Sequence, residues 1–440
     1  MKKRNFITVF LILVFGSTFG QKLDTKKLDS LFQILEIKDK FMGSIAVSEN
    51  GKIIYSKSIG KADIDSNKVI SDKTKFRIGS ISKMFTATLI LKAVEEKKLN
   101  LDQTIESYFP TIENAKIITI ENLLNHRSGI HDFTRNPDYI SYNTIEKTQS
   151  EMTTMIANGK SDFEPNSKFE YCNSNYVLLS YILEKIYKKP YKDIVNSKII
   201  KSLGLKNTYF GSKINIENSE SYSYYFDDKW VKETETDMSI PMGAGAIVSN
   251  PTDLCQFIES LFANKIISAK SIEQMIKFQD NYGLGIIKIP FFDKIGYGHT
   301  GAIDGFGSSL TYFPNEKITI ALNSNGREYE NGNIMIAVYS FYFDKPFKIP
   351  NFDFKLKTED LDKYLGEYLI PNTTKTITIS KDEDVLLAQA TGQSKFPLEV
   401  IDNDTFQFLA AGIKIEFIPS ENKMNITQGG KTKTLTKNTK

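Results

Sequence analysis

Residues 76–83 read F-R-I-G-S-I-S-K, and they set a serine and a lysine at the start of a predicted helix. Gly79 marks a turn, and apolar residues then recur with helical spacing over residues 84–91. Ser80 and Lys83 would therefore lie on one face of the first helical turn. Burial and the positive end of the helix dipole both favour the neutral form of such a lysine, which can then take the serine proton. The stretch predicts an activated serine that needs no histidine.

The S-x-x-K spacing is not specific by itself. It also occurs at Ser58–Lys61 and at Ser420–Lys423 in this lysine-rich chain. A serine at a helix start is otherwise an ordinary cap, and a helical lysine is usually solvated. The case for catalysis therefore depends on the rest of the sequence.

Two further blocks follow in chain order. Residues 171–173 read Y-C-N at the start of another amphipathic pattern, and residues 299–301 read H-T-G. The ordered triple resembles the serine β-lactamase and penicillin-binding-protein family, which carries S-x-x-K, then Y-x-N or S-x-N, then K-T-G or H-T-G. This resemblance covers most of residues 40–345. The flanking phrases L-L-N-H-R-S-G-I and G-A-G-A-I-V-S-N-P-T-D-L are similar to those of class C β-lactamases, D-alanyl-D-alanine carboxypeptidases, D-aminopeptidases and related esterases.

The resemblance implies catalytic roles for three residues. Ser80 would be the nucleophile that forms an acyl-enzyme, and Lys83 would be its base. Tyr171 would carry the proton between Ser80 and the leaving group, its phenol made acidic by Lys83 and its surroundings. The alternative for Tyr171 is an ordinary half-buried core tyrosine.

The resemblance also implies a substrate-binding set. Asn173 would point its amide at the lysine and the substrate, and Thr300 and Gly301 would pair with the substrate backbone along an edge strand. The backbone N–H groups of Ser80 and Ala302 would form the oxyanion hole. The alternative is an ordinary helix cap at residue 173 and an ordinary strand end at residues 299–301.

His299 stands where most β-lactamases carry lysine. A histidine there can donate to the Tyr171 oxygen or to a substrate carboxylate, and it is fully charged only at lower pH. Strict carboxypeptidases place an arginine for the substrate carboxylate after the Y-G-x-G strand start. Here Y-G-L-G at residues 282–285 is followed by Ile286, Ile287 and Lys288, so the arginine that would bind a terminal carboxylate is missing from this position.

Other kinds of site fit less well. The chain has three histidines and lacks a G-x-S-x-G motif, which argues against a Ser-His-Asp hydrolase. His126, His131 and Asp132 match no zinc spacing, so packing in a loop is favoured over a metal site. Cys172 is interpreted as a small buried filler and not as a second nucleophile. No metal and no organic cofactor is implied, and hydrolysis should be indifferent to chelators.

The N-terminal twenty residues have the layout of a secretory signal peptide. Basic residues at positions 2–4 precede an apolar segment at 6–15 and small residues at 16–20. We therefore expect export to the periplasm or the medium, with a retained N-terminal anchor as the alternative. No later segment is long enough to span a bilayer.

Composition excludes some partners. A net charge of +3, from 56 basic and 53 acidic residues, gives no support for nucleic-acid binding. Cys172 and Cys255 are too few for a disulfide framework, although one bridge between them is possible.

The pattern predicts two units after the signal peptide. Residues 21–345 would form an α+β hydrolase, in which helices lie between a hairpin near residues 43–57 and strands that return at 282–289, 297–300, 306–313 and 318–323. Residues 351–440 would form a small β-barrel or sandwich, because short alternating segments follow one another from 376 to 427. The opening at residues 361–368 resembles a lipocalin-like module. We expect this unit to act as a lid, a substrate-shaping element or a structural element, with a frayed tail from Gly429.

These features together predict an exported serine hydrolase that forms an acyl-enzyme on Ser80. H-T-G in place of K-T-G favours an amide or peptide substrate, as in D-alanyl-D-alanine carboxypeptidases and D-stereospecific peptidases. β-Lactamase or small-ester esterase activity is the alternative on the same fold. A catalytically slow binding or scaffold protein is the alternative from another class. The expected ligands are peptidoglycan-derived peptides, β-lactams or esters.

Overall fold

The computed structural model describes residues 23–353, 356–408, 411–428 and 431–438. The predicted signal peptide at residues 1–20 lies outside these ranges. Within them, none of the helices has the length and apolar character needed to span a bilayer.

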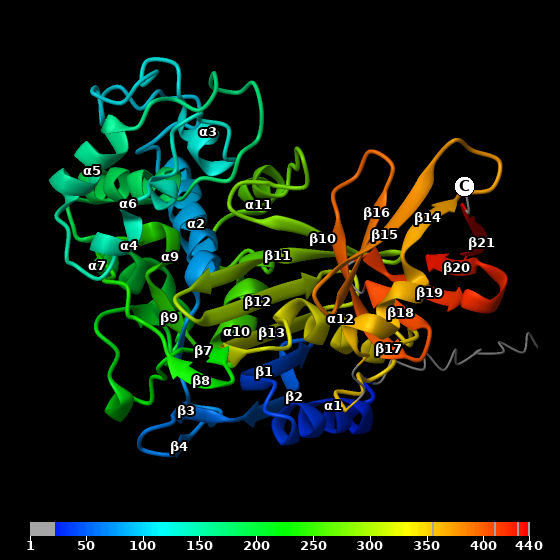
Figure 1. Ribbon diagram of the computed structural model, residues 1–440. Coiled ribbons are helices and arrows are strands. Elements are labelled where there is room, and N and C mark those ends of the chain that lie inside the picture. Colours follow the sequence, from blue (N-terminus) through cyan, green and yellow to red (C-terminus); the bar gives the residue numbers. More distant parts are fainter. Residues whose placement is uncertain (1–22, 354–355, 409–410, 429–430, 439–440) are drawn as a thin grey trace, which may run out of the picture.

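The core of the larger part is a six-stranded sheet built from both ends of its sequence (Figure 1). The strand order is β10-β11-β12-β13-β1-β2, and every neighbouring pair is antiparallel. The strands are β1 (Phe41–Glu49), β2 (Lys52–Ile59), β10 (Ile287–Phe291), β11 (Lys294–Ile303), β12 (Phe306–Phe313) and β13 (Ile318–Arg327). The first strand therefore pairs with the last, and the predicted α+β arrangement is confirmed.

The predicted hairpin is formed by β1 and β2. Asn50 and Gly51 join the two strands with φ values of 52° and 79°. Both residues adopt the left-handed backbone conformation that a tight hairpin turn requires, and asparagine and glycine tolerate this conformation best. The turn residues thus fix the register of this sheet edge.

Helices cover both faces of the sheet (Figure 1). Alternate residues of β1 point to opposite sides: Ile45 and Val47 pack with α1 (Thr25–Ile37) and α12 (Asn331–Tyr342), whereas Ala46 joins the larger core on the other side. That larger core contains α2 (Ser82–Glu95), α6 (Asn173–Tyr187) and α10 (Pro251–Phe262). The remaining helices are α3 (Ile120–Leu124), α4 (Tyr139–Tyr142), α5 (Gln149–Asn158), α7 (Tyr191–Val195), α8 (Lys201–Leu203), α9 (Met242–Gly245) and α11 (Ala269–Met275).

Short strands lie outside the six-stranded sheet, and one of them leads into the segment that carries Ser80. They are β3 (Lys61–Asp63), β4 (Lys68–Val69), β5 (Phe76–Arg77), β6 (Tyr209–Phe210), β7 (Tyr224–Asp227), β8 (Lys229–Lys232) and β9 (Ile247–Ser249). After β5, the single turn η1 (Gly79–Ile81) leads directly into α2. Arg77, 2% exposed, anchors this segment through ion pairs with Asp304 at 2.9 Å and Glu235 at 2.7 Å. The start of α2 is therefore held against the turn that follows β11.

Helix α10 begins at Pro251, and the Asn250 side chain before it accepts from the Asp253 N–H. One local expectation was wrong. The strand expected from Tyr282 begins only at Ile287. Gly285 has a φ of +73°, so the backbone is not extended just before the strand. Gly285 also lies against α2, where an added β-carbon would meet the Ala87 side chain at 2.6 Å.

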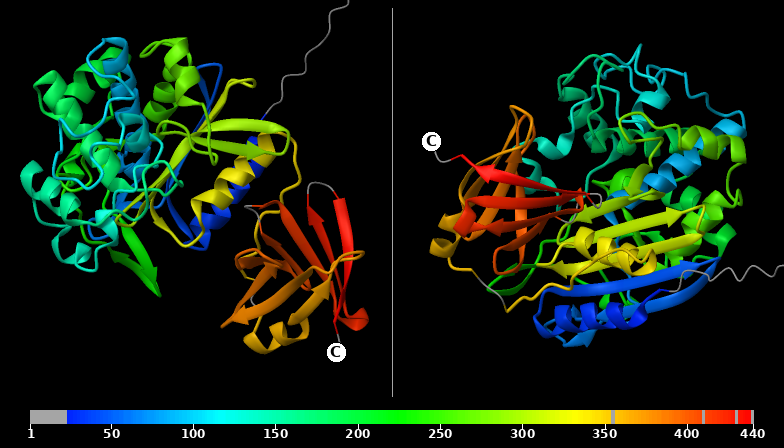
Figure 2. Two further views of the ribbon diagram at one scale, coloured as in Figure 1. Left: turned by 90° about the horizontal axis from the view of Figure 1, so that it is seen from above. Right: turned by 90° about the vertical axis from the view of Figure 1, so that its right-hand side faces the viewer.

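Residues 366–437 form a closed barrel, which is one of the two arrangements that the alternating pattern suggested. Its strands are β14 (Gly366–Leu369), β15 (Thr376–Asp382), β16 (Val385–Ala390), β17 (Phe396–Asp402), β18 (Thr405–Phe408), β19 (Ile413–Ile418), β20 (Lys423–Gln428) and β21 (Lys431–Lys437). The expectation of a frayed tail was wrong for residues 431–437, because β21 pairs with β20 and with β14 and buries Leu435. The barrel lies at the opposite end of the molecule from α5, α6 and α7 (Figures 1 and 2).

Candidate active site

Ser80 and Lys83 meet as the motif predicted. Ser80 lies in η1 and Lys83 lies in the first turn of α2, and the Lys83 Nζ is 2.9 Å from the Ser80 Oγ. Ser80 is half-buried, whereas Lys83 is completely buried among the aromatic and aliphatic residues of the large core. The pair combines an accessible hydroxyl with an amine that solvent does not reach.

The other partners of the Lys83 amine are compatible with its neutral form. Nζ lies 2.8 Å from the Asn173 Oδ1 and 3.0 Å from the Ala244 carbonyl oxygen, and both oxygens can only accept hydrogen bonds. A neutral amine has two hydrogens for these two acceptors, and its lone pair is then left for the Ser80 hydroxyl. Burial lowers the pKa of Lys83 to about 7, against the opposing effect of the nearby Asp132 carboxylate. Near neutral pH the amine can therefore accept the serine proton.

Tyr171 lies beside this pair. The Lys83 Nζ is 4.8 Å from the centre of its ring, and its buried hydroxyl is close to Ser80 but forms no hydrogen bond of regular geometry with any described residue. We expected Lys83 to make the phenol acidic; instead, burial raises the pKa of Tyr171. At neutral pH Tyr171 is a protonated hydroxyl that can donate to a bound group.

Asn173 is held by a residue that the motif does not contain. Its backbone N–H and its side-chain Nδ2 both donate to Asp132 Oδ2, at 2.9 and 3.0 Å. The other Asp132 oxygen accepts from the N–H and the hydroxyl of Thr134. With Nδ2 turned to Asp132, the Asn173 Oδ1 is fixed toward Lys83. Asp132 thus orients Asn173, which in turn orients Lys83. From the sequence we had expected only loop packing for Asp132.

The H-T-G block approaches η1 from the edge of the sheet. β10 pairs with β11 only as far as Gly298, so residues 299–303 have a free edge on that side. An added β-carbon on Gly301 would meet the Ile78 carbonyl oxygen at 2.1 Å and the Ser80 backbone nitrogen at 2.9 Å, and one on Gly79 would meet the Ala302 nitrogen at 2.8 Å. The Ser80 and Ala302 backbone N–H groups, which we expected to form an oxyanion hole, therefore both lie where η1 packs against β11. Thr300 and Ala302 are exposed beside it.

His299 does not face the catalytic pair with a ring nitrogen. It is 2% exposed, its Nε2 lies 3.0 Å from the Tyr282 hydroxyl, and its Nδ1 contacts the carbonyl oxygen of Thr300. Its ring centre lies 6.2 Å from that of Tyr171. The structure brings His299 next to the site but commits both of its nitrogens elsewhere.

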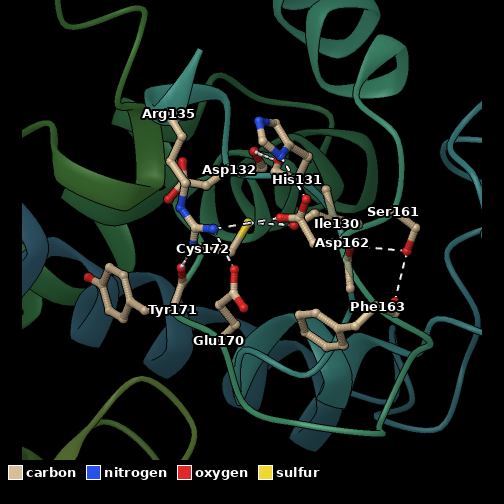
Figure 3. A network of polar contacts seen from close by, with 12 residues as sticks. Ile130, His131, Asp132, Arg135, Ser161, Asp162, Phe163, Glu170, Tyr171 and Cys172 are labelled. Atoms are coloured by element: carbon tan, nitrogen blue, oxygen red, sulfur yellow. Dashed lines mark hydrogen bonds and ion pairs between the residues drawn. The ribbon is translucent and has the colours of Figure 1, made fainter. Parts of the chain in front are cut away.

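A network of polar contacts borders the site next to Tyr171 (Figure 3). Arg135 lies between Glu170, Asp162 and the Tyr171 carbonyl oxygen, and His131 Nδ1 contacts Asp162 at 2.9 Å. The Tyr171 ring extends away from these charged groups in Figure 3. The network therefore fixes the backbone of the Y-C-N block and leaves the tyrosine ring to face the serine.

The two cysteines are both free and buried. The Cys172 thiol donates to the Ile130 carbonyl oxygen at 3.2 Å, and burial raises its pKa to about 12. A thiol with so little thiolate is a poor nucleophile, in agreement with the filler interpretation. Within the described ranges, no group of three or more histidine, cysteine or acidic residues is arranged to hold a metal ion.

Comparisons with known proteins agree on one protein family. The family model described as Beta-lactamase matches residues 37–338. Penicillin-binding protein 4* of Bacillus subtilis (strain 168) is 26% identical over 434 residues, covering 90% of this chain and 94% of the relative. Teichoic acid D-alanine hydrolase of Staphylococcus aureus (strain NCTC 8325 / PS 47) is 26% identical over 72% of this chain and 77% of its own length. The crystal structure of D-amino acid amidase from Ochrobactrum anthropi SV3 complexed with D-phenylalanine superposes with a TM-score of 0.63 at 25% identity, covering 72% of this chain and 98% of that one.

The family match spans well over half of the chain and includes all three motif blocks. Relatives named as hydrolases agree with a serine that is hydrogen-bonded to a buried lysine. The chain is a serine hydrolase that belongs to the β-lactamase family.

Proposed function

We propose that this chain is an exported hydrolase that forms an acyl-enzyme on Ser80 and acts on amides or peptides whose acyl group comes from a D-amino acid. The contact between the Ser80 hydroxyl and a buried amine with two fixed acceptors is the observation that carries the acylation chemistry. The D-configured substrate is supported by the names of the relatives, which include a teichoic acid D-alanine hydrolase and a D-amino acid amidase. Export is supported by the pattern of residues 2–20.

In the proposed reaction, every proton passes between residues of the site and the substrate. Lys83 takes the proton of Ser80 as the Oγ attacks the substrate carbonyl carbon, and the backbone N–H groups of Ser80 and Ala302 stabilise the oxyanion. Tyr171 gives its hydroxyl proton to the departing amine as the C–N bond breaks, and it recovers a proton from Lys83. Water then attacks the Ser80 ester by the same steps in reverse. The product is a free carboxylic acid.

A paired substrate panel tests the proposal. D-alanyl and L-alanyl amides, the corresponding p-nitrophenyl esters and benzylpenicillin would be offered to the mature chain, with turnover and intact-protein mass as readouts. We expect a preference for the D-amide over the L-amide of at least about tenfold, because the L-amide would place its methyl group where the pocket does not fit it, and one ill-fitting methylene-sized group costs about 1–3 kcal/mol. Turnover of esters alone would favour the esterase, and rapid release of a penicillin adduct would favour a β-lactamase. Absence of any adduct and any turnover would contradict the proposal.

The pH dependence should show a single ionisation on its acidic side. Lys83 must be neutral to accept a proton, so kcat/KM for acylation should rise with pH and level off above the Lys83 pKa of about 7. Burial lowers the pKa of His299 to about 3 and raises that of Tyr171, so neither should titrate between pH 5 and 9. Initial rates with a chromogenic substrate over this range give the profile. A flat profile, or one that falls from pH 5 to 8, would contradict a lysine base.

A further inference from the structure

A buried chain of hydrogen bonds joins the Y-C-N block to the H-T-G block. The Cys172 backbone N–H donates to His126 Nδ1 at 3.1 Å, and His126 Nε2 lies 3.1 Å from the Tyr282 hydroxyl. The same hydroxyl lies 3.0 Å from His299 Nε2, and His299 Nδ1 contacts the Thr300 carbonyl oxygen. His126 is fully buried, and Tyr282 and His299 are 4% and 2% exposed.

The two backbone groups at the ends of this hydrogen-bond chain determine which outer ring nitrogens carry a hydrogen. A backbone N–H can only donate, so His126 Nδ1 is bare and its Nε2–H donates to the Tyr282 oxygen. A carbonyl oxygen can only accept, so His299 Nδ1 carries its hydrogen. Burial lowers the pKa of His299 to about 3, so its Nε2 is bare at neutral pH and accepts from the Tyr282 hydroxyl. Both imidazoles are then neutral, and they hold opposite tautomers.

The surroundings of the chain support this assignment. Aromatic rings pack on His126, with centres 4.3 Å away for Tyr171, 5.2 Å for Tyr176 and 4.7 Å for Tyr282. The Tyr176 hydroxyl, which lies near that of Tyr282, donates its hydrogen to the Leu124 carbonyl oxygen at 2.7 Å and so does not compete with His126 as a donor to the Tyr282 oxygen. Burial, together with the nearby Lys83 charge, lowers the pKa of His126 and of His299.

A charged His299 would break this arrangement. Its Nε2–H would then point at a tyrosine oxygen that already accepts from His126, and the tyrosine hydrogen would lose the acceptor that it has on neutral His299. The loss of a buried hydrogen bond is costly. The chain therefore works against protonation of His299 in addition to the effect of burial.

We propose that His126 and Tyr282 are positioning residues of the active site, which hold His299 neutral in its Nδ1–H form and with both nitrogens engaged. The inference rests on the proposed function. Its consequence is that His299 has no free donor for Tyr171 or for a substrate carboxylate, in contrast to the expectation from the motif. The H-T-G edge then offers the substrate only backbone groups and the Thr300 side chain. It favours acyl donors without a free carboxylate next to the scissile bond.

The first part of the test reads the tautomers directly. The chain has three histidines, so long-range ¹H–¹⁵N spectra of the mature protein at pH 7 can be assigned with His→Gln variants. We expect an Nδ1–H pattern for His299 and an Nε2–H pattern for His126, both neutral. His131 is paired with Asp162 and does not belong to the hydrogen-bond chain, so it serves as the internal reference. A cationic or Nε2–H His299 in the wild type would overturn the proposal.

The second part removes the central link. Tyr282→Phe keeps the ring and deletes the hydroxyl that both histidines contact. We expect the His126 and His299 signals to shift, His131 to stay in place, and kcat to fall about 10- to 100-fold with KM changed less than about threefold. The matched control is Tyr339→Phe, which deletes a buried hydroxyl bonded to Thr311 on the other face of the sheet, at 2.7 Å, and should leave kcat unchanged.

Substrate selectivity supplies the third readout. A D-alanyl amide and the same amide carrying a free carboxylate on its leaving group would be compared in both proteins. We expect the wild type to prefer the uncharged amide at least about tenfold, and Tyr282→Phe to narrow this ratio. Equal rates for the two amides in the wild type, or a Tyr282→Phe variant that keeps both histidine signals and kcat, would overturn the proposal. Because the tautomers are read without turnover, an inert Ser80 would refute the proposed function and leave the histidine assignment standing.

Discussion

Replacement of Ser80 with alanine is expected to abolish covalent labelling and to lower turnover by at least about 10⁴-fold, because the acyl-enzyme can then not form. Ser80 carries the only hydroxyl that contacts the Lys83 amine among the described residues. Intact-protein mass after exposure to an activated D-alanyl ester, and separately to benzylpenicillin, gives the readout. The wild-type mass should rise by the mass of the acyl group, and the Ser80→Ala mass should not change.

The chain supplies a matched control for this experiment. Ser420 belongs to another S-x-x-K sequence, but it is exposed on the barrel and its Lys423 is paired with Glu421 at the surface. Ser420→Ala should therefore label and turn over like the wild type. Persistence of the adduct in Ser80→Ala, or its loss in Ser420→Ala, would assign the chemistry to another residue.

Replacement of Lys83 with methionine is expected to lower the acylation rate about 10³- to 10⁴-fold. Methionine has a similar length but cannot accept a proton, so the Ser80 hydroxyl loses its base. The acceptors Asn173 Oδ1 and Ala244 O also lose their donor, which should cost about 1–3 kcal/mol of stability, partly offset because no amine has to be desolvated. Single-turnover labelling separates acylation from later steps, and thermal unfolding checks that the variant is folded.

Lys423→Met is the corresponding control, because it removes an exposed amine from the same motif spacing. It should change neither the labelling rate nor its pH dependence. Lys83→Met should remove the rise in rate near pH 7 together with the rate itself. A Lys83→Met variant that still acylates within about tenfold of the wild-type rate would show that another group takes the serine proton.

Local patterns in the sequence determined much of this protein. Asn50 and Gly51 specify the first hairpin because their left-handed conformations need only their own backbones. The spacing of Ser80 and Lys83 places their side chains together because one helical turn does so in any context. Alternation of apolar residues likewise predicted a small all-β unit, although β14 and β21 lie outside the range of 376–427 that the pattern indicated. Neither has a long apolar run, and each is recognisable only by its pairing with neighbours.

Only the tertiary structure decided the properties of the site. Lys83 could be an ordinary solvated lysine by its sequence, and its low pKa arises because distant segments bury it and place Asn173 and Ala244 against it. His126 and Tyr282 lie far apart in the chain, and no spacing links them to His299. Their hydrogen bonds exist because folding brings the turn after α3, the loop before β10 and strand β11 together. Periodicity and spacing act through neighbours along the chain, whereas burial, proton positions and pKa values depend on all groups that folding assembles around a side chain.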